Sequence, residues 1–124
     1  MSPRRLLATV ALGRLAFGVL LTAKPETTVG PGWVGAEEAE RPATTLLFRS
    51  VGARDMALAL GTLGALRQGS RLRPWLLGAI LADAVDLGAT FAAGRAIPAQ
   101  GKASIALVAG GAIGAQVRLT RQLD

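Results

Sequence analysis

Residues 75–94 read WLLGAILADAVDLGATFAAG, a stretch in which Asp83 and Asp86 are the only ionisable side chains. A helix needs about 20 mainly apolar residues to cross the hydrocarbon core of a bilayer. Pro74 directly precedes the stretch and suits the first turn of a helix. The stretch does not alternate polar and apolar residues as a half-buried strand would. It therefore predicts a membrane-spanning helix that carries two carboxylates.

Three further apolar segments cover residues 6–23, 44–66 and 103–119. Lys24-Pro25 ends the first segment, because proline disfavours helix in the residue before it, and Pro42 opens the second. The last segment is the shortest and reaches a spanning length only with its polar flanks. Residues 24–43 form a long polar loop. Together the segments predict an all-α, four-helix transmembrane bundle with up-down-up-down topology, a single domain over residues 1–124.

The amino-acid composition excludes several kinds of catalytic and metal-binding group. Hydrophobic residues make up 51% of the chain, there are 16 glycines, and cysteine, histidine and tyrosine are absent. Disulfides, thiolate nucleophiles, imidazole bases and the usual zinc, haem and iron–sulfur ligands are thereby excluded. We therefore expect no cofactor, no metal site and no enzymatic activity. The formal charge is +6, but most Lys and Arg residues flank apolar runs and do not form one face, so we expect no nucleic-acid partner.

The same charges predict an orientation. If all four segments span, the N-terminus, the second loop and the C-terminus share one side, which holds Arg4, Arg5, Arg67, Arg71, Arg73, Arg118 and Arg121. The other side holds Lys24, Arg41, Arg95 and Lys102, together with all four glutamates. Basic residues concentrate on the cytoplasmic side of membrane proteins. Both termini are therefore expected in the cytoplasm, with the acidic loop outside.

Six ionisable residues lie within the predicted spans, namely Arg14, Arg49, Arg54, Asp55, Asp83 and Asp86. At a rise of about 1.5 Å per residue, Arg14 and Asp83 both lie about 13 Å from the cytoplasmic end. Arg54, Asp55 and Asp86 lie at about 18 Å, and Arg49 lies at about 26 Å, where its long stem can reach the outer interface. Matching heights predict the pairs Arg14–Asp83 and Arg54–Asp86.

Two interpretations of these charges remain open. Three positive and three negative charges can neutralise one another as an ion-pair network that holds the helices together. This favours a small structural or accessory membrane protein. The alternative is a small transporter or a proton- or ion-conducting module that uses the aspartates at the membrane midplane. Asp55 becomes an unmatched charge if Arg49 points outward.

Two readings of the whole chain compete with a membrane bundle. A soluble helical bundle would avoid the cost of about 2.5–3.5 kcal/mol for each charge at a helix centre in lipid. However, residues 58–66 and 76–81 offer almost no polar side chain for a solvated face. A cleaved signal peptide is disfavoured because Arg14 interrupts the first apolar stretch and no A-x-A site follows it. Trp33 and Trp75 fit either interfacial anchors or ordinary packing.

A motif in the second segment carries a family resemblance. It reads R-x-x-G-x-R-D at Arg49, Gly52, Arg54 and Asp55, with Gly61 following, and the third segment contains Ala82-Asp83-Ala84. Over most of its length the chain resembles a family of small bacterial four-span membrane proteins of unknown function. The resemblance implies a multi-pass protein of the bacterial cytoplasmic (inner) membrane and no particular activity. Its expected partners are the lipid bilayer and either further copies of itself or a larger membrane complex.

Overall fold

The computed structural model describes residues 1–123, which are mostly helical and contain no strand. Four long helices match the four predicted segments, and each extends a few residues beyond them. The third segment differs in one respect, because its helix ends two residues early at Ala92. The elements are α1 (Pro3–Ala23), α2 (Gly30–Val34), α3 (Ala36–Ala39), α4 (Pro42–Gln68), α5 (Arg73–Ala92), the 3-10 helix η1 (Gly94–Ala96) and α6 (Ala99–Leu123).

Local sequence signals set several helix ends. The Ser2 hydroxyl accepts a hydrogen bond from the Arg5 backbone N–H and so caps α1. A proline lies in the first turn of α1, α4 and α5, where its missing N–H costs nothing. Gly69 ends α4 in the left-handed conformation, with φ at 66°. The prolines thus explain where α1, α4 and α5 begin, and Gly69 explains where α4 ends.

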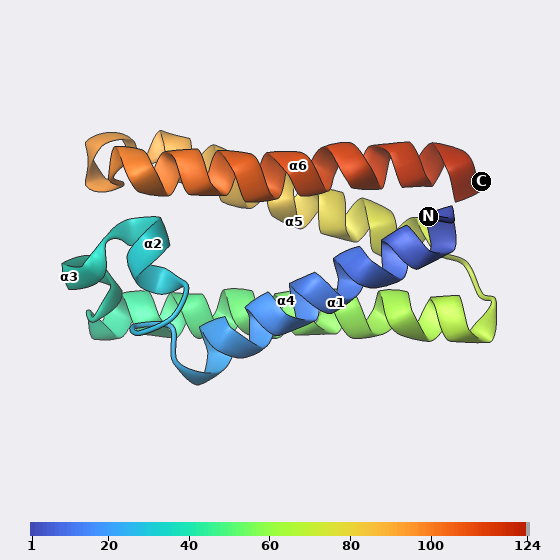
Figure 1. Cartoon of the computed structure of the whole chain (residues 1–124). Helices are drawn as coiled ribbons and strands as arrows, with labels where there is room; N and C mark the ends of the chain where they lie inside the picture. The colour runs from blue at the N-terminus through green and yellow to red at the C-terminus, as the bar shows by residue number, and fades with distance from the viewer. Residues whose placement is uncertain (124) are drawn as a thin grey trace.

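The long helices form two layers, α1 with α4 and α5 with α6, and α1 crosses α4 diagonally (Figure 1). The chain reverses direction at each connection between long helices, so the N- and C-termini lie at one end of the molecule (Figure 1). The short helices α2 and α3 lie at the opposite end.

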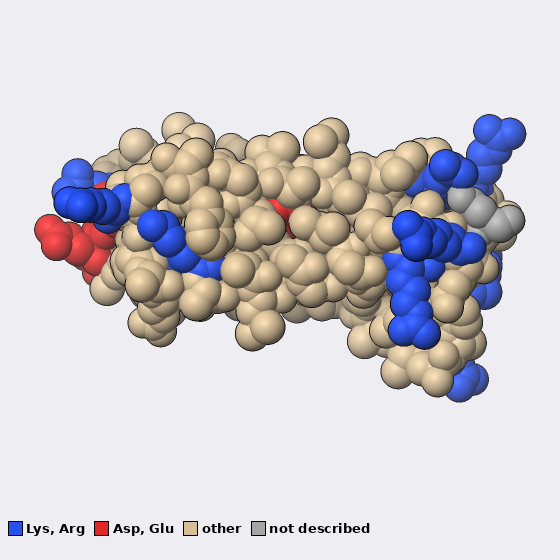
Figure 2. All heavy atoms as spheres, turned by 90° about the horizontal axis from the view of Figure 1, so that it is seen from above, with Lys and Arg blue, Asp and Glu red and all other residues tan. Residues whose placement is uncertain are grey.

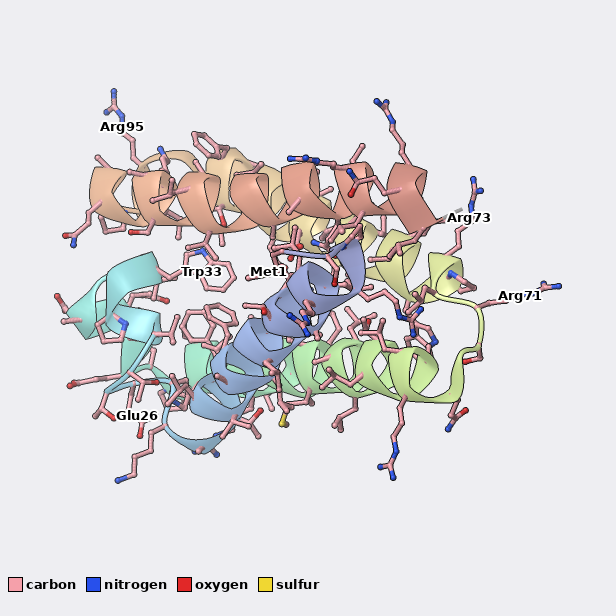
Figure 3. The ribbon with its side chains drawn as sticks, turned by 45° about the vertical axis from the view of Figure 1, so that its right-hand side comes forward. Met1, Glu26, Trp33, Arg71, Arg73 and Arg95 are labelled. Carbon is pink, nitrogen blue, oxygen red and sulfur yellow. The ribbon has the colours of Figure 1, made fainter. Side chains whose placement is uncertain are left out.

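Two expectations about the segments are corrected. Residues 24–43 are not simply a loop, because they hold α2 and α3. Trp33 of α2 reaches into the molecule (Figure 3), where its ring packs near Phe17 and Phe48 at centroid distances of 6.3 and 5.4 Å. Its indole N–H donates a 3.0 Å hydrogen bond to the Thr90 hydroxyl. The last segment is not the shortest either, since α6 has 25 residues.

Small residues allow α1 and α4 to approach closely. A methyl group added at Gly18 would meet the Gly52 carbonyl oxygen at 2.7 Å, and one added at Gly52 would meet the Gly18 carbonyl oxygen at 2.6 Å. The two helices therefore touch backbone to backbone at this point, as small residues permit in membrane helix pairs. Gly52 is the glycine of the R-x-x-G-x-R-D motif.

The outside of the bundle is apolar between its two ends. Helices α1, α5 and α6 are long and apolar enough to cross a membrane. Helix α4 has 27 residues but carries Arg49, Arg54, Asp55 and Arg67, and it is not among these three. In Figure 2 a belt almost free of charged side chains separates a basic end from an end where acidic and basic side chains both gather.

We expect Gly52→Ala to lower the stability of the detergent-solubilised protein by about 1–3 kcal/mol, because its methyl group forces α1 and α4 apart. Gly64→Ala is the matched control, since a methyl group there meets nothing within 4 Å. It should leave stability unchanged or raise it by about 0.5–1 kcal/mol, the usual gain from replacing a helical glycine. Thermal unfolding followed by circular dichroism measures both, and equal melting temperatures would contradict the close contact.

Candidate functional site

A cluster of charged side chains lies where α1, α4 and α5 meet. The Arg14 guanidinium of α1 donates from Nη2 to Asp83 Oδ2 of α5 at 2.5 Å and from Nη1 to Asp55 Oδ1 of α4 at 3.3 Å. One side chain therefore joins three helices. We call Arg14, Arg54, Asp55, Asp83 and Asp86 the central cluster.

Arg54 forms the second half of the central cluster. Its Nη1 and Nη2 atoms donate to the two oxygens of Asp86 at 2.9 and 2.6 Å, a two-pronged pairing that fixes both side chains. Arg54 also donates from Nε and Nη2 to Asp55 Oδ1 at 3.2 and 3.0 Å. Asp55 Oδ1 thus accepts hydrogen bonds from both arginines and couples the two pairs.

Gln116 of α6 extends the network to the fourth long helix. Its amide Nε2 donates to Asp83 Oδ2 and to the Ala112 carbonyl, both at 2.9 Å. Gln116 is not among the site residues predicted from the sequence. The signal that points to it is its position as the only polar side chain between Ser104 and Arg118, a run of otherwise apolar residues.

The central cluster is largely shielded from solvent. The exposed fractions of the side chains are 3% for Asp55 and 9% for both Arg14 and Asp83, against 31% for Arg54. Buried charges are tolerated only when they are paired and hydrogen-bonded. The hydrogen bonds among the five residues supply that pairing.

The structure brings five of the six predicted residues together and leaves one outside. The pairs Arg14–Asp83 and Arg54–Asp86, expected from their matching heights, are both present. Arg49 does not extend the central cluster, which corrects the expectation that it helps to balance the charges. It is exposed on α4, and the height argument fixes its level along the helix but not the side on which it lies. Two arginines and three aspartates leave the central cluster with a formal charge of −1.

One side of the central cluster opens into a pocket of about 290 Å³. Arg14, Asp55, Asp83 and Asp86 contribute its polar wall. Val10 and Phe17 of α1 and Ile105, Val108 and Ala109 of α6 contribute much of its apolar wall. Seen from above in Figure 2, red acidic atoms are also visible within the belt between the two ends. The three aspartates of the central cluster therefore line this pocket.

A second pocket reaches Asp86 from the end that α2 and α3 cover. Trp33, Glu38, Thr44 and Thr90 also line it. Asp86 is thus the residue that both pockets share. Within residues 1–123, no group of three or more His, Cys, Asp or Glu side chains is placed to hold a metal ion.

No protein-family model matches the chain, and neither the curated proteins nor the solved structures include one similar to it. The resemblance to small four-span bacterial membrane proteins therefore stays a prediction. Any function has to be argued from the central cluster and its pockets.

Because the central cluster has a formal charge of −1, removing a positive charge from it should cost more stability than removing a negative one. Arg14→Gln raises the excess charge to −2 and leaves buried carboxylates without their partner, which should cost about 3–5 kcal/mol of stability. Asp55→Asn makes the central cluster neutral, and the amide oxygen can still accept the hydrogen bonds that Asp55 Oδ1 accepts. We expect it to cost less than about 1.5 kcal/mol, the usual worth of one hydrogen bond.

Chemical or thermal unfolding of both variants in the same detergent measures this asymmetry. Arg49→Gln is the control, because it removes a positive charge from α4 outside the central cluster. It should unfold like the wild-type protein. Equal losses from Arg14→Gln and Asp55→Asn would contradict the excess negative charge.

Proposed function

We propose that the chain is a four-span integral protein of the bacterial cytoplasmic membrane with both termini in the cytoplasm. Three helices of spanning length and hydropathy support this placement. The fourth, α4, has two of its charges, Arg54 and Asp55, engaged within the central cluster. Its other two, Arg49 and Arg67, lie nearer its ends, where long side chains can reach the lipid headgroups.

The exposed apolar side chains support the same placement. Leu46 and Leu60 of α4, Leu81 of α5 and Leu107 of α6 are 66%, 58%, 65% and 78% exposed. Exposing large apolar side chains on several helices to water is unfavourable. In a bilayer they face lipid chains.

Within this membrane protein we propose a structural or accessory role, in which the bundle packs against itself or a larger membrane complex. The observation that carries the proposal is that one connected polar network includes side chains from all four long helices. Arg14, Asp55, Asp83 and Gln116 link α1, α4, α5 and α6 in turn. Such a network fixes the relative heights of the helices and gives a rigid unit.

The proposed topology can be tested with single cysteines, because the chain has none of its own. We expect Glu37→Cys and Gln100→Cys to react with a membrane-impermeant maleimide on intact cells. Ser70→Cys and Gln122→Cys should react only after the membrane is opened. All four positions are exposed in the structure.

The cysteine-free wild-type chain is the control for background labelling. Labelling of Glu37→Cys and Ser70→Cys from the same side would show that α4 does not span. A protein that stays in solution without detergent would contradict membrane insertion altogether.

A second candidate function is a small transporter or a proton- or ion-conducting module. Two observations favour it, namely the formal charge of −1 of the central cluster and the two pockets that Asp86 lines. Conducting sites in membranes are built from such buried ionisable residues.

Reconstitution into liposomes separates the two functions. Because the structural role needs no passage of charge, we expect wild-type liposomes to show no more proton or cation flux than protein-free ones. A pH-sensitive dye and a potential-sensitive dye report the two kinds of flux. Flux in the wild type that is lost in folded Asp55→Asn would instead favour the transporter.

A further inference from the structure

Two carboxylate oxygens of the central cluster accept no hydrogen bond from the described side chains. Asp86 uses both of its carboxylate oxygens to bind Arg54. Asp55 and Asp83, by contrast, accept all their side-chain hydrogen bonds through Oδ1 and Oδ2 respectively. Among the described side chains, none donates a hydrogen bond to Asp55 Oδ2 or Asp83 Oδ1. Asp55 Oδ2 and Asp83 Oδ1 therefore remain as unused acceptors in a cluster with a formal charge of −1.

These two acceptors are not sealed away. Within residues 1–123, Glu26 Oε2 is the only side-chain oxygen that is fully buried and has no hydrogen-bond partner. Asp55 Oδ2 and Asp83 Oδ1 therefore retain some exposure, although both residues are more than nine-tenths buried. Both residues line the 290 Å³ pocket.

The mouth of this pocket lies on the apolar outside of the bundle. Val108, which lines the pocket, is 58% exposed, and its neighbour Leu107 is 78% exposed. Helices α1 and α6 pack against each other far less than α1 packs on α4, so the pocket lies between two loosely packed helices. In the proposed membrane placement, a molecule would enter this pocket from the lipid phase.

We infer that the pocket binds a lipid-soluble monocation, such as a protonated amine or a quaternary cation with apolar substituents. A single positive charge of either kind balances the formal charge of −1. A protonated amine can also donate N–H hydrogen bonds to the free carboxylate oxygens, whereas a quaternary cation binds through its charge and apolar surface. The Phe17 ring in the wall can add a cation–π contact. An anion would meet net repulsion from the three aspartates that line the pocket.

This ligand class goes beyond the proposed structural role and rests only on the proposed membrane placement. The apolar wall from Val10, Ile105 and Ala109 fits the body of such a molecule. Arg14 also lines the pocket, but the aspartates outnumber the arginines around it. Apolar walls with a few converging polar groups are typical of small-molecule sites.

Tetraphenylphosphonium is a suitable probe, because it is permanently charged and apolar. We expect the purified protein in lipid nanodiscs to bind it saturably at one site, as measured by equilibrium dialysis. Asp55→Asn removes the excess charge and should weaken binding at least tenfold while the protein stays folded. Val108→Trp should also weaken binding, because it fills the pocket and leaves the charge unchanged.

Glu37→Gln is the matched control, since it removes an exposed carboxylate of α3, away from the pocket, and should leave binding unchanged. Triphenylphosphine oxide, which is uncharged, should bind at least tenfold more weakly than the cation. Equal binding to Asp55→Asn, or equal binding of the neutral probe, would overturn the inference and indicate simple apolar partitioning.

Absence of saturable binding by a folded protein would also overturn the inference, and it would leave the structural role standing. The cysteine labels test the proposed placement separately. If they show that α4 does not span, the proposed function fails whatever the probe does.

Discussion

The structure depends on the pairing of two arginines with three aspartates in a place from which water is largely excluded. A charge left alone in an apolar environment is costly, so these five side chains fix the helices that carry them. The Arg14–Asp83 pair lies about one helical turn closer than the Arg54–Asp86 pair to the end of the bundle that holds both chain termini. Both arginines also bind Asp55, which joins the two pairs. A shift of α5 by one turn along its axis would break both pairs at once. The central cluster therefore sets the relative heights of α1, α4 and α5, and Gln116 adds α6.

The close contact of α1 and α4 and the central cluster depend on each other. Gly18 lies four residues after Arg14, and Gly52 lies three residues before Asp55, so each glycine shares a helix face with its charged neighbour. The glycines bring the two backbones together, and this proximity lets Arg14 reach Asp55. Successive residues of a helix point about 100° apart, so Arg54 can pair with Asp86 of α5 while Asp55 meets Arg14. The G-x-R-D part of the motif thus combines a close helix contact with pairing in two directions.

Sequence reasoning reached the helices and the two main pairs because both follow from position along the chain. Proline and lysine mark the breaks, and counting residues along each apolar run gives the height of each charge. It could not place Arg49, because height says nothing about which side of α4 faces the other helices. Gln116 was missed because a lone amide offers no opposite charge to match. Helices α2 and α3 were also missed, since residues 24–43 show no helical periodicity and Trp33 is positioned by contacts with Phe17, Phe48 and Thr90.

Because Arg49 points outward, the charges of the central cluster do not balance. With three arginines the charges would balance, and helix cohesion alone would account for them. With two, the arginines satisfy Asp86 fully but leave one oxygen each on Asp55 and Asp83, and both residues line the same pocket. That pocket lies between α1 and α6, whereas α1 makes its closest packing with α4 on another side. Asp55 and Asp83 therefore serve two ends within one network: each uses one oxygen to hold the helices together and keeps a second acceptor beside the same pocket.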